Sequence, residues 1–176
     1  PSDSIRIPGE EWGGGETGWY ATRIAASPGY LETMDIPLLQ GHFFQEQDRQ
    51  DGTPVAAVNR LLAENRFPGR SPVGERLVVG GVEREIVGVV EDFMQRRIPF
   101  DGFVEPAAFL PAAQLPLRNV AFAIRTASEP AALASDVRNA VWNVDPDQPI
   151  AQLQTLQQFI DVELAAPAFL GLFVGA

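Results

Sequence analysis

The side chains that could do chemistry in this chain are few, and carboxylates dominate them. His42 is the only histidine among 176 residues, cysteine is absent, and all 13 basic residues are arginines. A Schiff-base lysine, a thiolate nucleophile and a Cys/His zinc cluster are therefore excluded. His42 alone could serve a serine–histidine relay or anchor a carboxylate-rich metal site, and we expect it to be structural or on the surface.

One acidic stretch superficially resembles a calcium-binding loop. Glu46, Asp48 and Asp51 precede Gly52 within a polar, turn-forming segment. The alternate-position oxygen ligands and the terminal glutamate of such a loop are missing. We therefore expect a solvated turn and no metal ligand here.

Two pairs of neighbouring acids could supply a general acid and a general base. Glu32 and Asp35 lie one turn apart in a short expected helix, and Glu91 adjoins Asp92 at the end of an expected strand. Paired carboxylates do this work only when one of them sits in a dry pocket. Adjacent acids are common on surfaces, so we expect no catalytic, cofactor-binding or metal-binding residue.

The remaining candidates are glycines, one basic pair and a group of aromatic residues. No glycine-rich phosphate-binding motif is present, and Gly80-Gly81 is expected to form a hairpin turn. Arg96-Arg97 could dock a partner carboxylate or a lipid headgroup, although such a pair is more often simply exposed. The aromatic group could line a cleft or a partner surface, with core packing as the default. Its members are Phe43, Phe44, Phe67, Phe93, Phe100, Phe103 and Phe109.

The composition is that of a folded, acidic globular chain. The formal net charge is −10, 45% of the residues are hydrophobic and 20% are charged. The arginines are scattered and an acidic surface repels phosphate, so we expect no nucleic-acid partner. No stretch reaches the roughly 20 apolar residues that span a bilayer. Residues 164–176 nevertheless carry no charge, which indicates either a longer parent chain approaching a membrane or a C-terminal core helix.

The elements that would position these residues follow from residue patterns. Residues 1–17 are expected to be loop or edge structure. Strands are expected at 19–26, 36–44, 55–58, 77–79, 82–90, 107–110, 120–126 and 150–154. Helices are expected after Ser27-Pro28, after an Asn59 cap, at 130–144 with Leu133, Val137 and Val141 inward, and after a Thr155–Gln158 capping box.

This order of elements predicts an α+β fold. Strand–helix–strand occurs before Phe44 and again after Asn119, and two such halves can share one sheet. We expect a split βαβ sandwich made of residues 1–48 and 117–166, interrupted by an inserted mixed α/β subdomain at 49–116. Residues 167–176 would begin a membrane-proximal helix. Polar hinges are expected near Arg49 and Leu115.

Several segments, in this order, resemble the extracytoplasmic domain of MacB-type ABC transporter permeases, in the broader FtsX-like permease family. The similarity covers almost everything from Ser27 onward. The segments are SPGYLETMDIPLLQGHFF at 27–44, VAAVNRLLAENRFPGRSPVGERL at 55–77, REIVGVVEDF at 84–93, FLPAAQ at 109–114, IRTASEPAALASDVRNAVWNVDPDQPI at 124–150, and LAAPAFLGLFVGA at 164–176.

The resemblance implies a domain between the first and second transmembrane helices, on the periplasmic side of the inner membrane. It implies a porter-like subdomain with an inserted sabre-like subdomain, no catalytic site and no cofactor. ATP would be hydrolysed by a cytoplasmic ATPase, and this domain would move in response, a mode called mechanotransmission. The implied partners are the flanking transmembrane helices, that ATPase, a second permease copy or half, and a periplasmic adaptor or lipoprotein.

Two other classes of function remain open from the residues. A free-standing solute- or lipoprotein-binding module would use the aromatic group to line a pocket. A carboxylate hydrolase would need two acids converging in one cleft with a shifted pKa.

Overall fold

The computed structural model describes residues 2–9, 19–93 and 104–162. By its internal contacts the chain forms two compact units. Unit 1 comprises Pro1–Gln95 and Phe103–Ala123, and unit 2 comprises Arg96–Gly102 and Ile124–Ala176.

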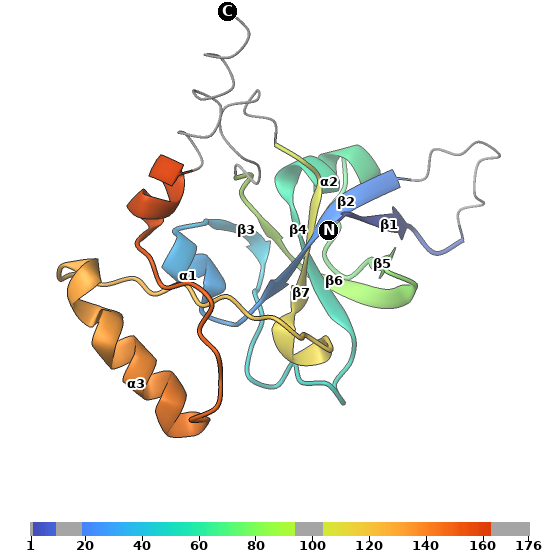
Figure 1. Cartoon of the computed structure of the whole chain (residues 1–176). Coiled ribbons are helices and arrows are strands. Elements are labelled where there is room, and N and C mark those ends of the chain that lie inside the picture. Colours follow the sequence, from blue (N-terminus) through green and yellow to red (C-terminus); the bar gives the residue numbers. More distant parts are fainter. Residues whose placement is uncertain (1, 10–18, 94–103, 163–176) are drawn as a thin grey trace, which may run out of the picture. The chain divides into compact units, whose positions relative to one another are not determined.

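Unit 1 is built around a sheet that closes on itself (Figure 1). The strand order is β3-β6-β4-β7-β2-β1-β5, and β5 also pairs with β6, so the six strands from β6 to β5 form a closed ring. β3 is attached to β6 outside the ring. The strands are β1 (Ser2–Arg6), β2 (Trp19–Ala26), β3 (Leu38–Gly41), β4 (Val55–Asn59), β5 (Arg76–Val79), β6 (Val82–Val90) and β7 (Ala107–Pro111).

The long strand β6 makes this closure. Its first residues pair with β5 through the Gly80-Gly81 turn, whose φ angles of 58° and 81° favour glycine, as the sequence predicts. Its later residues pair with β4 on one side and with β3 on the other. Residues 86–90 are all buried, which confirms the prediction of a strand covered on both faces.

Two apolar clusters fill unit 1. One gathers around Leu62, Phe67 and Ile86, so it includes the buried side of α2 (Arg60–Arg66). The other gathers around Phe109 and includes Leu31 of the short helix α1 (Tyr30–Met34). Both clusters contain residues from strands that precede residue 48 and from strands that follow it. The strands on the two sides of residue 48 therefore pack together in the same body.

The expected subdomain boundary at residues 48/49 therefore does not separate two sheets. β3 lies before this boundary and β6 after it, and their backbones pair. Within the segment 1–17, expected to be loop or edge structure, residues 2–6 differ from the expectation, because β1 pairs with β2 on one side and with β5 on the other. The pattern failed here because β1 is short and largely polar, and its place is set by its two neighbours.

Unit 2 contains helical structure and, among its described residues, no strand. The predicted helix is present as a 3₁₀ turn, η2 (Pro130–Leu133), followed by α3 (Ala134–Val144). A further helix covers the described residues 156–162. It begins at the predicted capping box, since the Gln158 amide donates to Thr155 Oγ1 and Gln158 Oε1 accepts from the Thr155 amide.

The strands predicted at 120–126 and 150–154 were wrong, and so was the buried face of α3. Val120 and Phe122 are exposed, the latter by 80%, and their alternating pattern finds no neighbouring strand in the described residues. No residue of α3 is buried: Val137 and Val141 are half-buried and Val144 is 88% exposed. Strand propensity needs a pairing partner before it makes a strand.

Candidate functional site

Asn59 is a fully buried polar residue at the junction of β4, α2 and β7. Its Oδ1 accepts from the Leu62 amide at 3.2 Å, which is the predicted helix cap, and from the Ala107 amide at 2.8 Å. Its Nδ2 donates to Asp92 Oδ1 at 2.8 Å and to the Glu105 carbonyl at 3.0 Å. Both donors and both acceptor positions of this amide are therefore used.

The acidic pair Glu91-Asp92, a candidate for acid–base chemistry, is part of the same cluster. Asp92 Oδ1 also accepts from the Leu61 amide at 3.0 Å, and Asp92 Oδ2 accepts from Arg60 Nε at 3.1 Å. Glu91 Oε1 lies 3.1 Å from Arg60 Nη2. The hydrogen bond to Asp92, followed by the charge of Glu91, raises the pKa of Arg60. These carboxylates brace the start of α2 against the end of β6.

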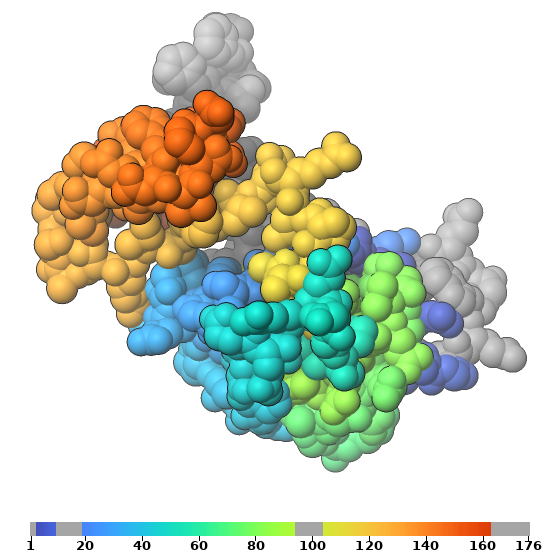
Figure 2. Space-filling model, turned by 90° about the horizontal axis from the view of Figure 1, so that it is seen from below, coloured from blue at the N-terminus to red at the C-terminus, as the bar shows by residue number. Residues whose placement is uncertain are grey.

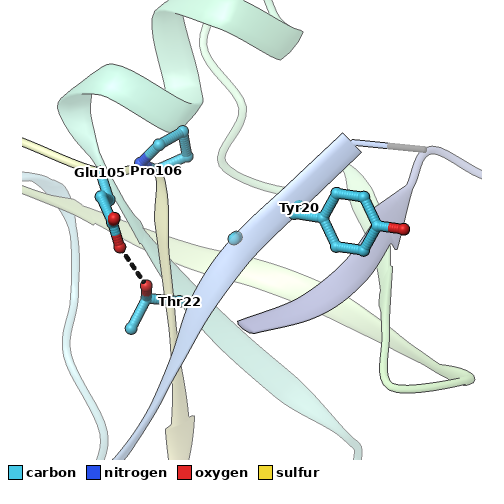
Figure 3. Close-up of a pocket in the computed structure, with 5 residues that line it drawn as sticks. Tyr20, Thr22, Glu105 and Pro106 are labelled. Carbon is cyan, nitrogen blue, oxygen red and sulfur yellow. Dashed lines mark hydrogen bonds between the residues drawn. The ribbon is translucent and has the colours of Figure 1, made fainter. Parts of the chain in front are cut away.

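A small open pocket lies beside this cluster (Figure 3). Its volume is about 220 Å³, and its lining residues are Tyr20, Ala21, Thr22, Glu105 and Pro106. Thr22 Oγ1 donates to Glu105 Oε2 at 2.9 Å, and the Tyr20 ring points away from this pair. Pockets for drug-sized ligands occupy about 300–1,000 Å³, so this pocket is too small for such a solute.

The other sequence candidates lie apart from this cluster. His42 is exposed, with Nδ1 3.0 Å from the Phe43 carbonyl oxygen. Glu32 and Asp35 are exposed at α1, where Asp35 forms the C-cap in the left-handed conformation (φ 59°). Arg96 and Arg97 lie outside the described residues.

The stretch that resembles a calcium loop is a hydrogen-bonded turn. Asp48 Oδ2 accepts from the Gln45 amide at 2.8 Å, and Arg49 Nε donates to the Glu46 carbonyl at 2.9 Å. Within residues 2–9, 19–93 and 104–162, no group of three or more His, Cys, Asp and Glu side chains is arranged to hold a metal ion.

The aromatic group packs in the core around Phe109. The Phe109 ring centroid lies 6.0 Å from Tyr30, 6.0 Å from Phe43 and 5.6 Å from Phe93. Phe44 is buried in the same cluster. Core packing, the default for these residues, is confirmed for this part of the group, while Phe100 and Phe103 lie outside the described residues.

A second polar cluster, which the sequence did not single out, joins Arg84 of β6 to Gln114. Gln114 ends the 3₁₀ turn η1 (Ala112–Gln114). Gln114 Oε1 accepts from Arg84 Nη1 at 2.9 Å and from the Val55 amide at 3.4 Å. Gln114 Nε2 donates to the Arg49 carbonyl at 3.3 Å and to the Thr53 carbonyl at 3.0 Å. We call this cluster the Arg84–Gln114 clasp.

The positions expected to be hinges, near Arg49 and Leu115, are held by contacts within unit 1. The Arg49 carbonyl is held by Gln114, and Leu115 packs against the first apolar cluster. Figure 2 shows this end of unit 1, where the yellow segment that includes η1 lies against the teal loop before β4. Both expected hinges are thus tied to the same body.

The sequence offered no local signal for the clasp. Glu83, Arg84 and Glu85 are three consecutive charged residues, and only Arg84 is buried, at 4% exposure. Which of the three turns inward depends on the register of β6 against β4 and β5.

Comparison with known proteins identifies the family to which this sequence is similar. The MacB-like periplasmic core domain family matches residues 5–140. A macrolide export ATP-binding/permease protein, MacB, from Rhodospirillum rubrum is 38% identical over 74 residues, which are 41% of this chain and 11% of that protein. The chain thus aligns with only about a tenth of the length of this relative.

Two solved structures share the fold. The periplasmic region of MacB from Actinobacillus actinomycetemcomitans matches with a TM-score of 0.57 at 12% identity, covering 82% of this chain and 63% of that one. A domain of a protein described as a permease from Porphyromonas gingivalis matches with a TM-score of 0.53 at 16% identity, covering 90% and 77%.

Within the described residues, none of the helices has both the length and the apolar character needed to cross a membrane. The expected α+β fold and the resemblance are both confirmed by the family match and by the fold of these neighbours. The chain belongs to the MacB-like periplasmic core domain family, whose model matches residues 5–140.

Proposed function

We propose that this domain couples ATP hydrolysis in the cytoplasm to movement outside the membrane, in transport or mechanotransmission, and is not itself catalytic. The observation that carries the proposal is the family match over residues 5–140, to a domain of ATP-binding/permease proteins. The relative from Rhodospirillum rubrum joins an ATP-binding part and a permease in one protein. For this chain, the ATPase and the flanking transmembrane helices are the proposed partners.

The arrangement of polar residues suits a body that transmits movement. Asn59 and Gln114 each use their amide groups to join segments far apart in sequence. The buried Asn59 amide has all its hydrogen-bonding positions used, and such satisfied polar groups rigidify a fold and favour one arrangement of its elements. A closed ring of strands braced in this way would move as one piece when attached membrane helices shift.

The porter-like and sabre-like parts of the resemblance remain proposals for this chain. We place a boundary near residues 123/124, which is one of the points where the two compact units meet in the sequence. The expected boundary at residues 48/49 is not retained, because β3 and β6 pair across it. A second permease copy or half, and a periplasmic adaptor or lipoprotein, are the proposed extracytoplasmic partners.

Spin labelling of the full-length permease with its ATPase would test this proposal. This chain has no cysteine, so Val82→Cys, at the exposed tip of the β5–β6 hairpin, gives one labelling site per domain. We expect the distance between labels on two domains to change between the nucleotide-free and the ATP-bound transporter. The same label with an ATPase variant that cannot bind ATP is the control. An unchanged distance would contradict the proposed movement.

A free-standing solute-binding module is the weaker alternative. Its aromatic residues would line a pocket, but Phe109 and its neighbours fill the core of unit 1. No observation on the described residues favours it.

A further inference from the structure

Arg84 is a buried cation in an acidic protein. Its Nη1 donates to Gln114 Oε1 and to the Val55 carbonyl at 3.4 Å, and its Nε has no hydrogen-bond partner. Within the described part of the chain no ion pair joins it to a carboxylate, whereas Arg23, for example, pairs with Asp3 at 3.0 Å. Burial, with a further contribution from the charge of Arg23, lowers the pKa of the Arg84 guanidinium.

Such a site is costly to maintain, because burying a charge requires compensating hydrogen bonds. Gln114 provides the principal compensation at 2.9 Å. The pair joins residues that are 30 positions apart in sequence. Breaking it would leave a buried charge with one long contact to a carbonyl, so the clasp resists separation of its two halves.

The clasp lies where the chain leaves the ring of strands. Gln114 follows β7 directly through η1, and Leu115 then packs against the core. Beyond Leu115 the chain runs to Thr126 without a helix or a strand, and the boundary between the two units falls at residues 123/124. A pull that travels along the chain from the 123/124 boundary therefore passes Leu115 and Gln114 before it reaches β7.

Gln114 distributes such a pull over three segments. Its side chain holds Arg84 of β6, the Val55 amide at the start of β4, and two carbonyls of the loop before β4. β4 and β6 are neighbours in the sheet and pair over their length. Without the clasp, the same pull would reach β4 and β6 only through the packing of Leu115 and through the pairing of β7 with β4.

We propose that Arg84 and Gln114 are positioning residues for force transfer. The clasp fixes the point and direction at which the segment after Gln114 leaves the ring of strands, so movement of that segment turns the ring as a whole. This inference rests on the proposed function, because it assigns a route for the same movement. The two residues touch no substrate and take part in no chemical step.

The first test measures the clasp itself in the 176-residue chain. Gln114→Met keeps the side-chain length and removes all four hydrogen bonds of the Gln114 amide. The rate of hydrogen–deuterium exchange at the Val55 amide, and at the backbone amides of the loop at 49–54, should therefore rise about tenfold or more. Gln40→Met is the matched control, because exposed Gln40 accepts one side-chain hydrogen bond, from Ser71. Unchanged exchange in Gln114→Met would overturn the clasp as a structural brace.

The second test measures force transfer in the full-length permease carrying the Val82→Cys label. We expect Gln114→Met to reduce the ATP-driven distance change by at least half, and Gln40→Met to leave it as in the parent. If the parent label does not move, the proposed function fails. If the parent moves and Gln114→Met moves equally, only the clasp proposal fails.

A double variant separates force transfer from stability. Arg84→Met combined with Gln114→Met replaces the buried polar pair by apolar side chains of similar length, so the melting temperature lost in Gln114→Met should largely return. The bonds to the loop before β4 stay absent, so the distance change should stay reduced. Recovery of the distance change together with the melting temperature would show a role in stability alone and overturn the proposal.

Discussion

Replacement of Asn59 tests whether its buried side-chain amide stabilises the junction of β4, α2 and β7. Asn59→Ala removes the α2 cap, which costs about 1 kcal/mol. It also leaves the buried Ala107 amide without its acceptor at 2.8 Å, which costs about 1–3 kcal/mol. We therefore expect a loss of about 2–4 kcal/mol in the free energy of unfolding, out of the roughly 5–15 kcal/mol that a domain has.

Asn59→Asp gives a sharper, pH-dependent result. Aspartate keeps both acceptor contacts, but it places a carboxylate oxygen where Nδ2 now donates to Asp92 Oδ1 at 2.8 Å. Two carboxylates this close share a proton, which raises the pKa of the folded pair above the ordinary value of about 3.9. The variant should be closest to wild type below about pH 4, where both states bind the proton, and should lose stability as pH rises through the raised pKa.

Urea unfolding of wild type, Asn59→Ala and Asn59→Asp at pH 4 and pH 8, followed by circular dichroism, measures both effects. The difference between Asn59→Asp and wild type should grow by at least about 1.4 kcal/mol between the two pH values, which corresponds to one pKa unit. A constant difference, or an Asn59→Ala loss below about 0.5 kcal/mol, would refute the assignment of these four hydrogen bonds.

Three further substitutions probe the core, the edge strand and alkaline stability. Phe109→Ala, at a fully buried ring, should cost about 3–5 kcal/mol in urea unfolding, and a loss below about 1 kcal/mol would contradict its central place. Gly41→Ala should lower the melting temperature more than Gly69→Ala does. Both glycines have positive φ, but a Cβ at Gly41 would lie 2.2 Å from the Val87 carbonyl oxygen, whereas a Cβ at Gly69 would meet open space. Equal melting temperatures of the two variants would refute this. Burial raises the pKa of Tyr30 above 10.0, so folding stability should fall as pH rises through that range, and Tyr30→Phe should show a shallower loss above pH 10.

Features that depend on a few neighbouring residues were predictable from the sequence. The Asn59 cap, the Gly80-Gly81 turn and the Thr155–Gln158 capping box each follow from local backbone geometry. Burial of residues 86–90 was also predictable, because an uninterrupted apolar run must be covered on both faces.

Features that depend on distant partners were not predictable in the same way. β1 is a strand because β2 and β5 flank it, and the strand-like run at 120–126 lacks a partner among the described residues. The polar bonds of Gln114 to Arg49 and Thr53 span 65 and 61 positions of the chain. A single sequence shows propensity and pattern, and it does not show which distant segments meet.

Closure of the strand ring has a consequence for how this domain folds. The ring pairs Ile5 with Val79 and Thr22 with Ala107, so the last strands of the ring cannot pair until residues well beyond 100 have been synthesised. Contacts of such long sequence separation make folding slow, and an incomplete ring exposes unpaired strand edges that promote aggregation. Deleting residues 2–6 would open the ring between β2 and β5, leaving each with one neighbour, β7 and β6 respectively, and one unpaired edge, so the shortened polypeptide should aggregate more readily than the whole one.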